Sequence, residues 1–256
     1  MEDAIALVTG AAGGIGAAVV RALGRRGMRV AAVDRDAGRL DEVVGKMVAD
    51  GLSVEAFPAD VTSAAEVEEL VDGVESALGP VDHLVNAAGV LRMSPVSQLA
   101  DEDWAATFAV NTTGVMQMSR AVVSRMVPRS RGAIVTVASN AAGTPRTEMA
   151  AYAASKAAAT MFTKCLALEV ARHGIRCNVV APGSTDTAML RSMWHDESGP
   201  QATIDGRPDA YKLGIPLGKL ARPADIADAV VFLLSEQAGH ITMHDLTVDG
   251  GATLGV

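Results

Sequence analysis

Short apolar runs alternate with longer amphipathic segments along most of the chain. The apolar runs are rich in Val, Ala, Ile and Leu, as in buried parallel strands. They predict strands at 4–10, 29–34, 53–60, 81–89, 132–139, 175–183 and 245–251. The segments between them carry apolar residues at helical spacing and predict helices at 15–26, 36–50, 64–78, 104–126, 150–173 and 225–235.

This alternation predicts an α/β fold. Repeated strand–helix units favour a parallel sheet with right-handed crossovers. We therefore expect a single Rossmann-type, doubly wound domain over residues 1–256, with about seven strands and helices on both faces. The segment at about 183–216, rich in Gly, Pro, Ser, Thr and Asp, breaks the pattern. An irregular stretch of this length predicts a substrate-binding loop.

The composition argues against several classes of protein. The formal net charge is -8 and no Lys/Arg block occurs, which disfavours a nucleic-acid partner or an anionic membrane surface. No apolar run reaches the ~20 residues of a membrane span, and the acidic start is unlike a signal peptide. Cys165 and Cys177 lack motif spacing, which predicts reduced core thiols in a cytoplasmic protein. The histidines, His195 among them, lack metal-ligand spacing, so we expect no metal.

The sequence TGAAGGIG at 9–16 follows the first predicted strand and opens the first predicted helix. Glycines there allow a tight turn and a close approach of the backbone to a ligand, and the helix N-terminus offers N–H groups to a pyrophosphate. A glycine-rich turn alone also occurs without a ligand, but this strand–turn–helix context favours a dinucleotide. The expected contacts are Gly10, Gly13, Gly14, Ile15 and Gly16.

Asp34 ends the second predicted strand and is followed by Arg35. A carboxylate at this position binds both ribose hydroxyls and repels a 2′-phosphate, which predicts NAD as the cofactor. The alternative is that Asp34 caps the next helix. Arg35 is expected to contact the cofactor as well, and its charge weakens the preference for NAD.

Polar residues also stand at the ends of the third and fourth predicted strands. Ligands of open α/β sheets lie at the carboxyl ends of the strands, so we expect cofactor contacts there. Asp60 is placed to meet the adenine amine, although Asp and Asn also favour turns without any ligand. The expected contacts at these two ends are Asp60, Val61, Asn86, Ala87 and Gly89.

Tyr152 and Lys156 lie one turn apart on a predicted helix. A phenol with a pKa of about 10 is a poor base at neutral pH, and a nearby ammonium favours the phenolate. The pair therefore predicts a base that takes the hydroxyl proton of an alcohol, with Ser139 holding the reacting oxygen. Lys156 is also expected to bind the nicotinamide ribose. The alternative is an exposed surface pair.

The motifs T-G-x-x-x-G-I-G, N-A-A-G and Y-x-x-x-K, with Asn111 and Ser139, resemble the short-chain dehydrogenase/reductase family over essentially the whole chain. The resemblance implies a catalytic tetrad of Asn111, Ser139, Tyr152 and Lys156, in which Asn111 links the lysine to a proton relay. It also implies that the PGSTDT segment touches the nicotinamide carboxamide. The contacts expected from that segment are Pro182, Gly183, Thr185 and Thr187.

Longer runs, including NAAGVLRM, CNVVAPGSTDTAM and KLGIPLGKLARP, are similar to the 2,3-dihydro-2,3-dihydroxybenzoate dehydrogenases of catecholate siderophore synthesis. This similarity implies NAD-dependent oxidation of the C3 hydroxyl of a cyclohexadiene carboxylate, followed by aromatisation. Ala188 stands where an acidic residue is usual, which leaves the ring substituents open. The alternatives are an amino-substituted dihydroaromatic acid, a generic ketoreductase and an inactive cofactor-binding protein.

A substrate carboxylate requires a cation near the nicotinamide. Arg146, between Ser139 and Tyr152, is the first candidate, ahead of Arg92 and Arg191. We also expect Met93, Met189 and Ser139 itself to contact the substrate.

The family resemblance implies a homotetramer in which the predicted helices at 104–126 and 150–173 meet those of a partner. Ala153, Ala157, Met161 and Cys165 form a stripe on the second of these helices. The alternative is that this stripe packs on the sheet of its own chain.

Overall fold

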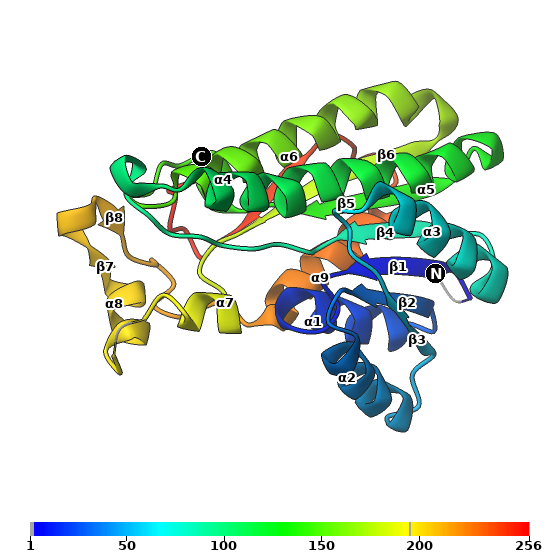
Figure 1. Ribbon diagram of the computed structural model, residues 1–256, viewed down its shortest axis with the longest axis horizontal. Coiled ribbons are helices and arrows are strands. Elements are labelled where there is room, and N and C mark those ends of the chain that lie inside the picture. Colours follow the sequence, from blue (N-terminus) through cyan, green and yellow to red (C-terminus); the bar gives the residue numbers. More distant parts are fainter. Residues whose placement is uncertain (1–2, 195, 256) are drawn as a thin grey trace.

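The computed structural model describes residues 3–194 and 196–255, so His195 lies outside the described residues. The central feature is a parallel sheet of seven strands among the described residues, in the order β3-β2-β1-β4-β5-β6-β9 (Figure 1). The order reverses between β1 and β4, as in a doubly wound fold. The strands are β1 (Ile5–Thr9), β2 (Arg29–Asp34), β3 (Val54–Pro58), β4 (His83–Asn86), β5 (Gly132–Val137), β6 (Ile175–Pro182) and β9 (Asp245–Val248).

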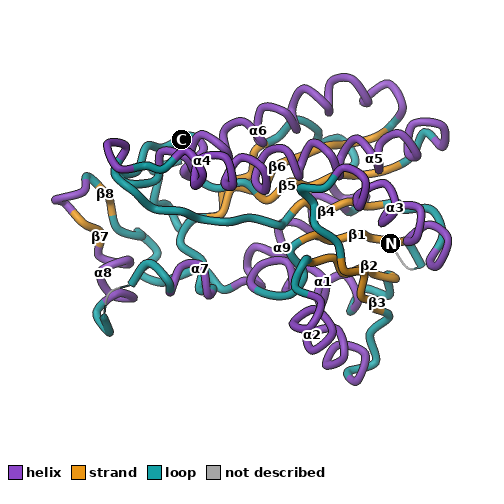
Figure 2. Tube along the Cα trace, viewed as in Figure 1, coloured by secondary structure: helices purple, strands orange, loops and turns teal. Residues whose placement is uncertain are grey.

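Helices cover both faces of this sheet (Figures 1 and 2). One face packs against α1 (Gly14–Gly24), α2 (Ala37–Ala49) and α9 (Pro223–Leu234). The other face packs against α3 (Ala64–Leu78), α5 (Val115–Arg129) and α6 (Ala150–Val170). The predicted Rossmann-type α/β fold is confirmed.

Side chains alternate between the two faces of each strand. In β1, Ala6 and Val8 belong to the core under α1 and α9, whereas Ile5 and Leu7 belong to the core under α3 and α5. Because a parallel sheet is covered on both sides, most positions of the strands are apolar. Thr9, Asp34 and Asn86 stand at the carboxyl ends of their strands, where the loops begin.

The helix predicted at 104–126 is interrupted in the structure. It consists of α4 (Asp101–Phe108), a π-helical turn (Ala109–Gly114) and α5. A π-helical turn adds one residue to a helical turn and often marks a functional position. Asn111 lies in this turn and is fully buried.

The segment 183–216 is less irregular than predicted. It contains α7 (Ala188–Arg191), α8 (Gly199–Asp205) and an antiparallel hairpin of β7 (Gly206–Arg207) and β8 (Lys212–Leu213). These elements are too short to show a period in the sequence. They lie apart from the sheet, beyond the ends of its strands (Figures 1 and 2).

The structure also bears on the two cysteines, which were predicted to be core thiols, and on the stripe of residues along α6. Cys177 is buried, and burial raises the pKa of its thiol to about 12. Cys165 is exposed, so the prediction of a core thiol is wrong for this residue. Met161, on the same stripe, is 60% exposed, which shows that the stripe does not pack on the sheet of its own chain. Within the described residues no helix has the length and apolar character of a membrane span.

Candidate active site

The carboxyl ends of β1, β4, β5 and β6 meet at one edge of the sheet. Thr9 Oγ1 accepts hydrogen bonds of 3.1 Å from the amides of both Ala87 and Ala88, which ties the end of β4 to the end of β1. Between this edge and the segment from Gly183 to Ile215 lies a cavity of about 430 Å³. That volume is typical of a small-molecule site. The cavity lies at the edge where open α/β sheets bind their ligands.

The glycine-rich turn has no room for side chains at two positions. Gly10 has φ of 70°, and a Cβ there would lie 2.8 Å from the backbone of Ala87. A Cβ on Gly16 would overlap the carbonyl oxygen of Gly10. Helix α1 begins at Gly14, and no described side chain caps it at Gly13, so its first N–H groups face outward. This cradle fits a pyrophosphate.

Asp34 is held beneath this turn. Its Oδ2 accepts a hydrogen bond of 3.1 Å from the amide of Ala12, and its Oδ1 accepts one from the amide of Asp36. The cap of α2 is Asp36, which accepts from the amide of Arg39, so the alternative of Asp34 as that cap is excluded. Arg39 was not predicted as a site residue. A Cβ added to Gly13 would lie 2.8 Å from Arg39 Nη2, so the guanidinium of Arg39 lies directly against this glycine.

The residues at the ends of β3 and β4 differ in what their side chains do. Asp60 Oδ1 accepts from both the amide and the hydroxyl of Thr62, which is the turn role weighed as its alternative. Asp60 and Arg35 line a second, shallow depression. The side-chain amide of Asn86 donates a hydrogen bond to Ser119 Oγ in the interior. Ala87 and Gly89, together with Ile15, line the main cavity, whereas Val61 is buried against Gly114.

Tyr152 and Lys156 occupy the first two turns of α6. They are only 9% and 5% exposed, so the alternative of a surface pair is excluded. Lys156 Nζ donates a hydrogen bond of 2.8 Å to the carbonyl of Val137 and lies 5.9 Å from the centroid of the Tyr152 ring. Burial lowers the pKa of Lys156 to about 8.

The expected lowering of the Tyr152 pKa is not found in this structure. Burial raises the pKa of the phenol, and a hydrogen bond with Ser139 only partly opposes it. The ammonium of Lys156 is directed to the carbonyl of Val137 rather than to the phenol oxygen. Ser139 lines the same cavity, at the end of β5.

Asn111 lies beneath the cavity rather than on its wall. Its Nδ2 donates to the carbonyl of Val90 at 2.9 Å and to Ser155 Oγ at 3.0 Å, and its Oδ1 accepts from the amide of Val90. A Cβ on Gly89 would come within 3.4 Å of both Asn111 Oδ1 and Lys156 Nζ. The π-helical turn therefore fixes the backbone after β4 against α6, directly beside the lysine.

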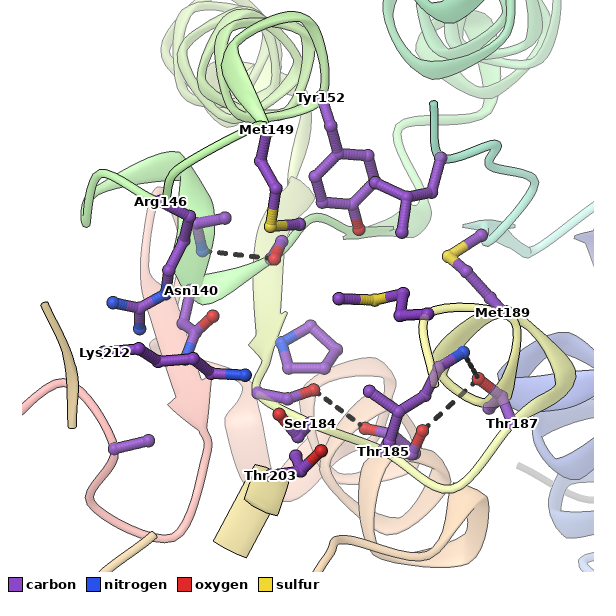
Figure 3. Close-up of a pocket in the computed structure, with 18 of the residues that line it drawn as sticks. Asn140, Arg146, Met149, Tyr152, Ser184, Thr185, Thr187, Met189, Thr203 and Lys212 are labelled. Carbon is purple, nitrogen blue, oxygen red and sulfur yellow. Dashed lines mark hydrogen bonds between the residues drawn. The ribbon is translucent and has the colours of Figure 1, made fainter. Parts of the chain in front are cut away.

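The segment after β6 forms the lower wall of the cavity in Figure 3. Thr187 Oγ1 accepts from the amide of Leu190 and thereby begins α7, and Thr185 is buried. A Cβ on Gly14 would lie 3.5 Å from Thr187, so this wall meets the glycine-rich turn. The predicted residues of this segment that line the cavity are Pro182, Gly183, Thr185, Thr187 and Met189.

The three candidate arginines differ in position. Arg146 lines the cavity, and burial lowers its pKa although Asp249 attracts it. Arg92 pairs with Asp103 at 3.6 Å and Arg191 pairs with Asp186, and neither lines the cavity. Met93 does line it. The structure adds polar and charged lining residues that sequence reasoning missed: Asn140, Thr147, Glu148, Ser184, Asp196, Ser198, Thr203, Arg207 and Lys212.

Comparisons with known proteins agree on one family. The family model described as short chain dehydrogenase matches residues 4–198. A 2,3-dihydro-2,3-dihydroxybenzoate dehydrogenase of Bacillus subtilis is 58% identical over 256 residues, covering 100% of this chain and 98% of that protein. A protein of the same name from Escherichia coli is 43% identical, covering 97% and 96%. A solved gluconate 5-dehydrogenase of Burkholderia cenocepacia, in complex with NADP and tartrate, superposes with a TM-score of 0.92 at 30% identity, covering 100% and 97%.

Proposed function

The chain belongs to the short-chain dehydrogenase family, and on that premise we propose that it oxidises 2,3-dihydro-2,3-dihydroxybenzoate to 2,3-dihydroxybenzoate with NAD. The observation that carries this proposal is a single cavity with a buried Tyr152–Lys156 pair and the guanidinium of Arg146 on its walls. These groups suit a substrate that is both an alcohol and a carboxylate. The names of the relatives that match over the whole chain support this substrate.

The reaction removes a proton from the C3 hydroxyl oxygen and a hydride from C3 itself. Tyr152 accepts the proton of the C3 hydroxyl, while Ser139 donates a hydrogen bond to the reacting oxygen. NAD, when bound, supplies the oxidised nicotinamide that accepts the hydride from C3. The resulting dienone tautomerises to the catechol, and the gain of aromaticity makes the sequence favourable.

Lys156 and Asn111 support the proton transfer to Tyr152 in different ways. The ammonium, held by the carbonyl of Val137, places positive charge beside the phenol and faces the position expected for the nicotinamide ribose. Asn111 does not touch the substrate in this proposal. It positions the backbone at Val90 and the start of α6 through its hydrogen bonds to Val90 and Ser155.

The preference for NAD rests on Asp34. Its carboxylate lies between the second strand and the glycine-rich turn, where it meets a ribose and repels a 2′-phosphate. Arg35 and Arg39 bring positive charge to the same end of the site and oppose this preference. The proposed cofactor contacts remain those of the sequence analysis, with Arg39 added.

The proposed function is tested by absorbance at 340 nm. Purified protein with NAD and 2,3-dihydro-2,3-dihydroxybenzoate is expected to give NADH and a catechol product. The matched comparison is the analogue with an amino group at ring position 2, whose product is 3-hydroxyanthranilate. Faster turnover of the amino analogue, or no turnover of the diol acid, would overturn the proposal.

A further inference from the structure

The hairpin of β7 and β8 presents two cations to the cavity from the same strand pair. Arg207 and Lys212 are direct partners in its antiparallel register, so their side chains share one face. Both residues line the cavity. In Figure 3, Lys212 reaches into the cavity beside Arg146, which extends from the segment before α6, and Tyr152 enters from above. Three cationic side chains thus surround one end of the cavity.

Two of these cations have acidic groups close to them. Arg207 pairs with Asp209 at 2.6 Å, and the carboxylate of Glu148 is also near enough to favour its charge. Arg146 is attracted by Asp249. That carboxylate in turn accepts hydrogen bonds from Asn140 and Thr253, which hold it in place.

Lys212 differs from both arginines. Within the part of the chain that the structure describes, no acidic group lies near enough to favour the charge of its ammonium, although the side chain is only partly exposed. Burial lowers the pKa of Lys212, and the positive charges of Arg146 and Arg207 lower it further. Like charges on facing strand positions destabilise a hairpin, and a partly buried charge costs free energy until it is paired. An anion in the cavity removes both costs.

We propose that Lys212, together with Arg146, binds the carboxylate of the substrate and thereby selects acids over neutral alcohols. This inference rests on the proposed function, because it assigns the groups that recognise the carboxylate of that substrate. Lys212 comes from the hairpin, whereas Arg146 comes from the chain between β5 and α6. The anion therefore joins the hairpin to the sheet-bearing part of the molecule while Tyr152 faces the ring hydroxyl.

The test compares two ligands that differ only in the carboxylate. Binding of 2,3-dihydroxybenzoate and of catechol to NAD-saturated protein is measured by calorimetry. Lys212→Met keeps an unbranched side chain of nearly the same length and removes the charge. It is expected to weaken 2,3-dihydroxybenzoate about ten- to hundredfold and to leave catechol unchanged. Turnover of the diol acid should show a raised KM with kcat nearly kept.

Two further variants separate charge from folding. Lys212→Arg restores a cation and is expected to recover most of the affinity for 2,3-dihydroxybenzoate. Lys219→Met makes the same substitution at an exposed position just beyond the hairpin, outside the cavity, and is expected to change neither ligand. Equal losses for both ligands in Lys212→Met, or no loss for either, would overturn the inference.

The failure of the proposed function gives a different result. If the unmutated protein does not oxidise the diol acid, the proposed substrate is wrong, and benzoate replaces 2,3-dihydroxybenzoate as the carboxylate probe. A selective loss of benzoate binding in Lys212→Met then retains the carboxylate site. The same affinity for benzoate in both proteins removes the carboxylate site as well.

Discussion

At the scale of single residues, burial opposes the ionisation that catalysis needs. The pKa of Tyr152 is raised by burial, so a base at neutral pH needs positive charge next to it. The Lys156 ammonium lies 5.9 Å from the centroid of the phenol ring, and its own pKa of about 8 leaves it mostly protonated at neutral pH. The carbonyl oxygen of Val137 accepts a hydrogen bond from this ammonium and so favours the protonated form of Lys156.

Tyr152→Phe removes only the phenol oxygen and is expected to lower kcat by about a hundred- to ten-thousandfold. NAD binding, followed by quenching of protein fluorescence, should be retained because the ring still fills the same space. Lys156→Ala should weaken both turnover and NAD binding, since the ammonium is proposed to serve both. Near-normal turnover in Tyr152→Phe would contradict the proposed base.

Asp34 is the residue on which the choice of cofactor depends. Asp34→Ala removes the proposed ribose contact and the repulsion of a 2′-phosphate, while Arg35 and Arg39 remain. We expect the ratio of kcat/KM for NAD to that for NADP to fall by at least about tenfold, equivalent to ~1.4 kcal/mol. Asp36→Ala is the matched control, because it removes a neighbouring carboxylate that caps α2. Equal efficiency with both cofactors in the unmutated protein would disprove the preference.

At the scale of elements, β4 carries a titratable group that links stability to pH. Burial lowers the pKa of His83 to about 4, although Asp82 opposes the shift. Its Nδ1 is buried and has no hydrogen-bond partner among the described residues. The folded protein therefore holds this imidazole neutral, whereas the unfolded chain protonates it below a pKa of about 6.5.

The sign of the effect follows from this difference. The stability associated with His83 is present above about pH 6.5 and is lost as pH falls toward 4, by up to ~3 kcal/mol. Urea unfolding between about pH 7 and pH 5 is expected to show the decline. His83→Leu should show a shallower decline over the same range, because it cannot take up the proton. The same pH dependence in both proteins would rule out His83 as its source.

The sequence predicted those elements that have a clear period or a marked end. All seven strands were predicted from short apolar runs, and the long helices from apolar residues at helical spacing. The π-helical turn was missed because one extra residue hardly disturbs a helical pattern. The hairpin of β7 and β8 was missed because strands of two residues have no measurable alternation.

The site residues likewise divide into those with a signal in the sequence and those that only the fold brings together. Tyr152, Lys156 and the glycine-rich turn were found because their spacing along the chain is itself the signal. Lys212 and Arg39 were missed because only the fold brings them to the cavity and to Gly13. Arg146 was ranked ahead of Arg92 and Arg191 because it lies between Ser139 and Tyr152 along the chain, and in three dimensions the other two form surface ion pairs.

At the scale of the whole molecule, one face of the chain remains apolar and uncovered. On α6, Met161 is 60% and Leu168 70% exposed, and Cys165 lies exposed between them. On α4, Trp104 is 42% exposed and stacks on Phe108 at 4.6 Å. Apolar groups gathered on neighbouring helices of one face are typical of a subunit interface. The proposed homotetramer covers this face by pairing α6 and its neighbours with those of a second subunit.

Light scattering is expected to give a mass four times the 26.3 kDa of the chain. The double substitution Met161→Glu and Leu168→Glu places like charges across a two-fold interface and should shift the mass toward smaller species. Val48→Glu is the control, because Val48 is 52% exposed on α2, on the other side of the sheet, and should leave the mass unchanged.

The double variant should remain folded by circular dichroism, since neither side chain contributes to the core of its own chain. A stable monomer of the unmutated protein at micromolar concentration would contradict the proposed assembly. An unchanged tetramer in the double variant would show instead that the subunits meet through another face.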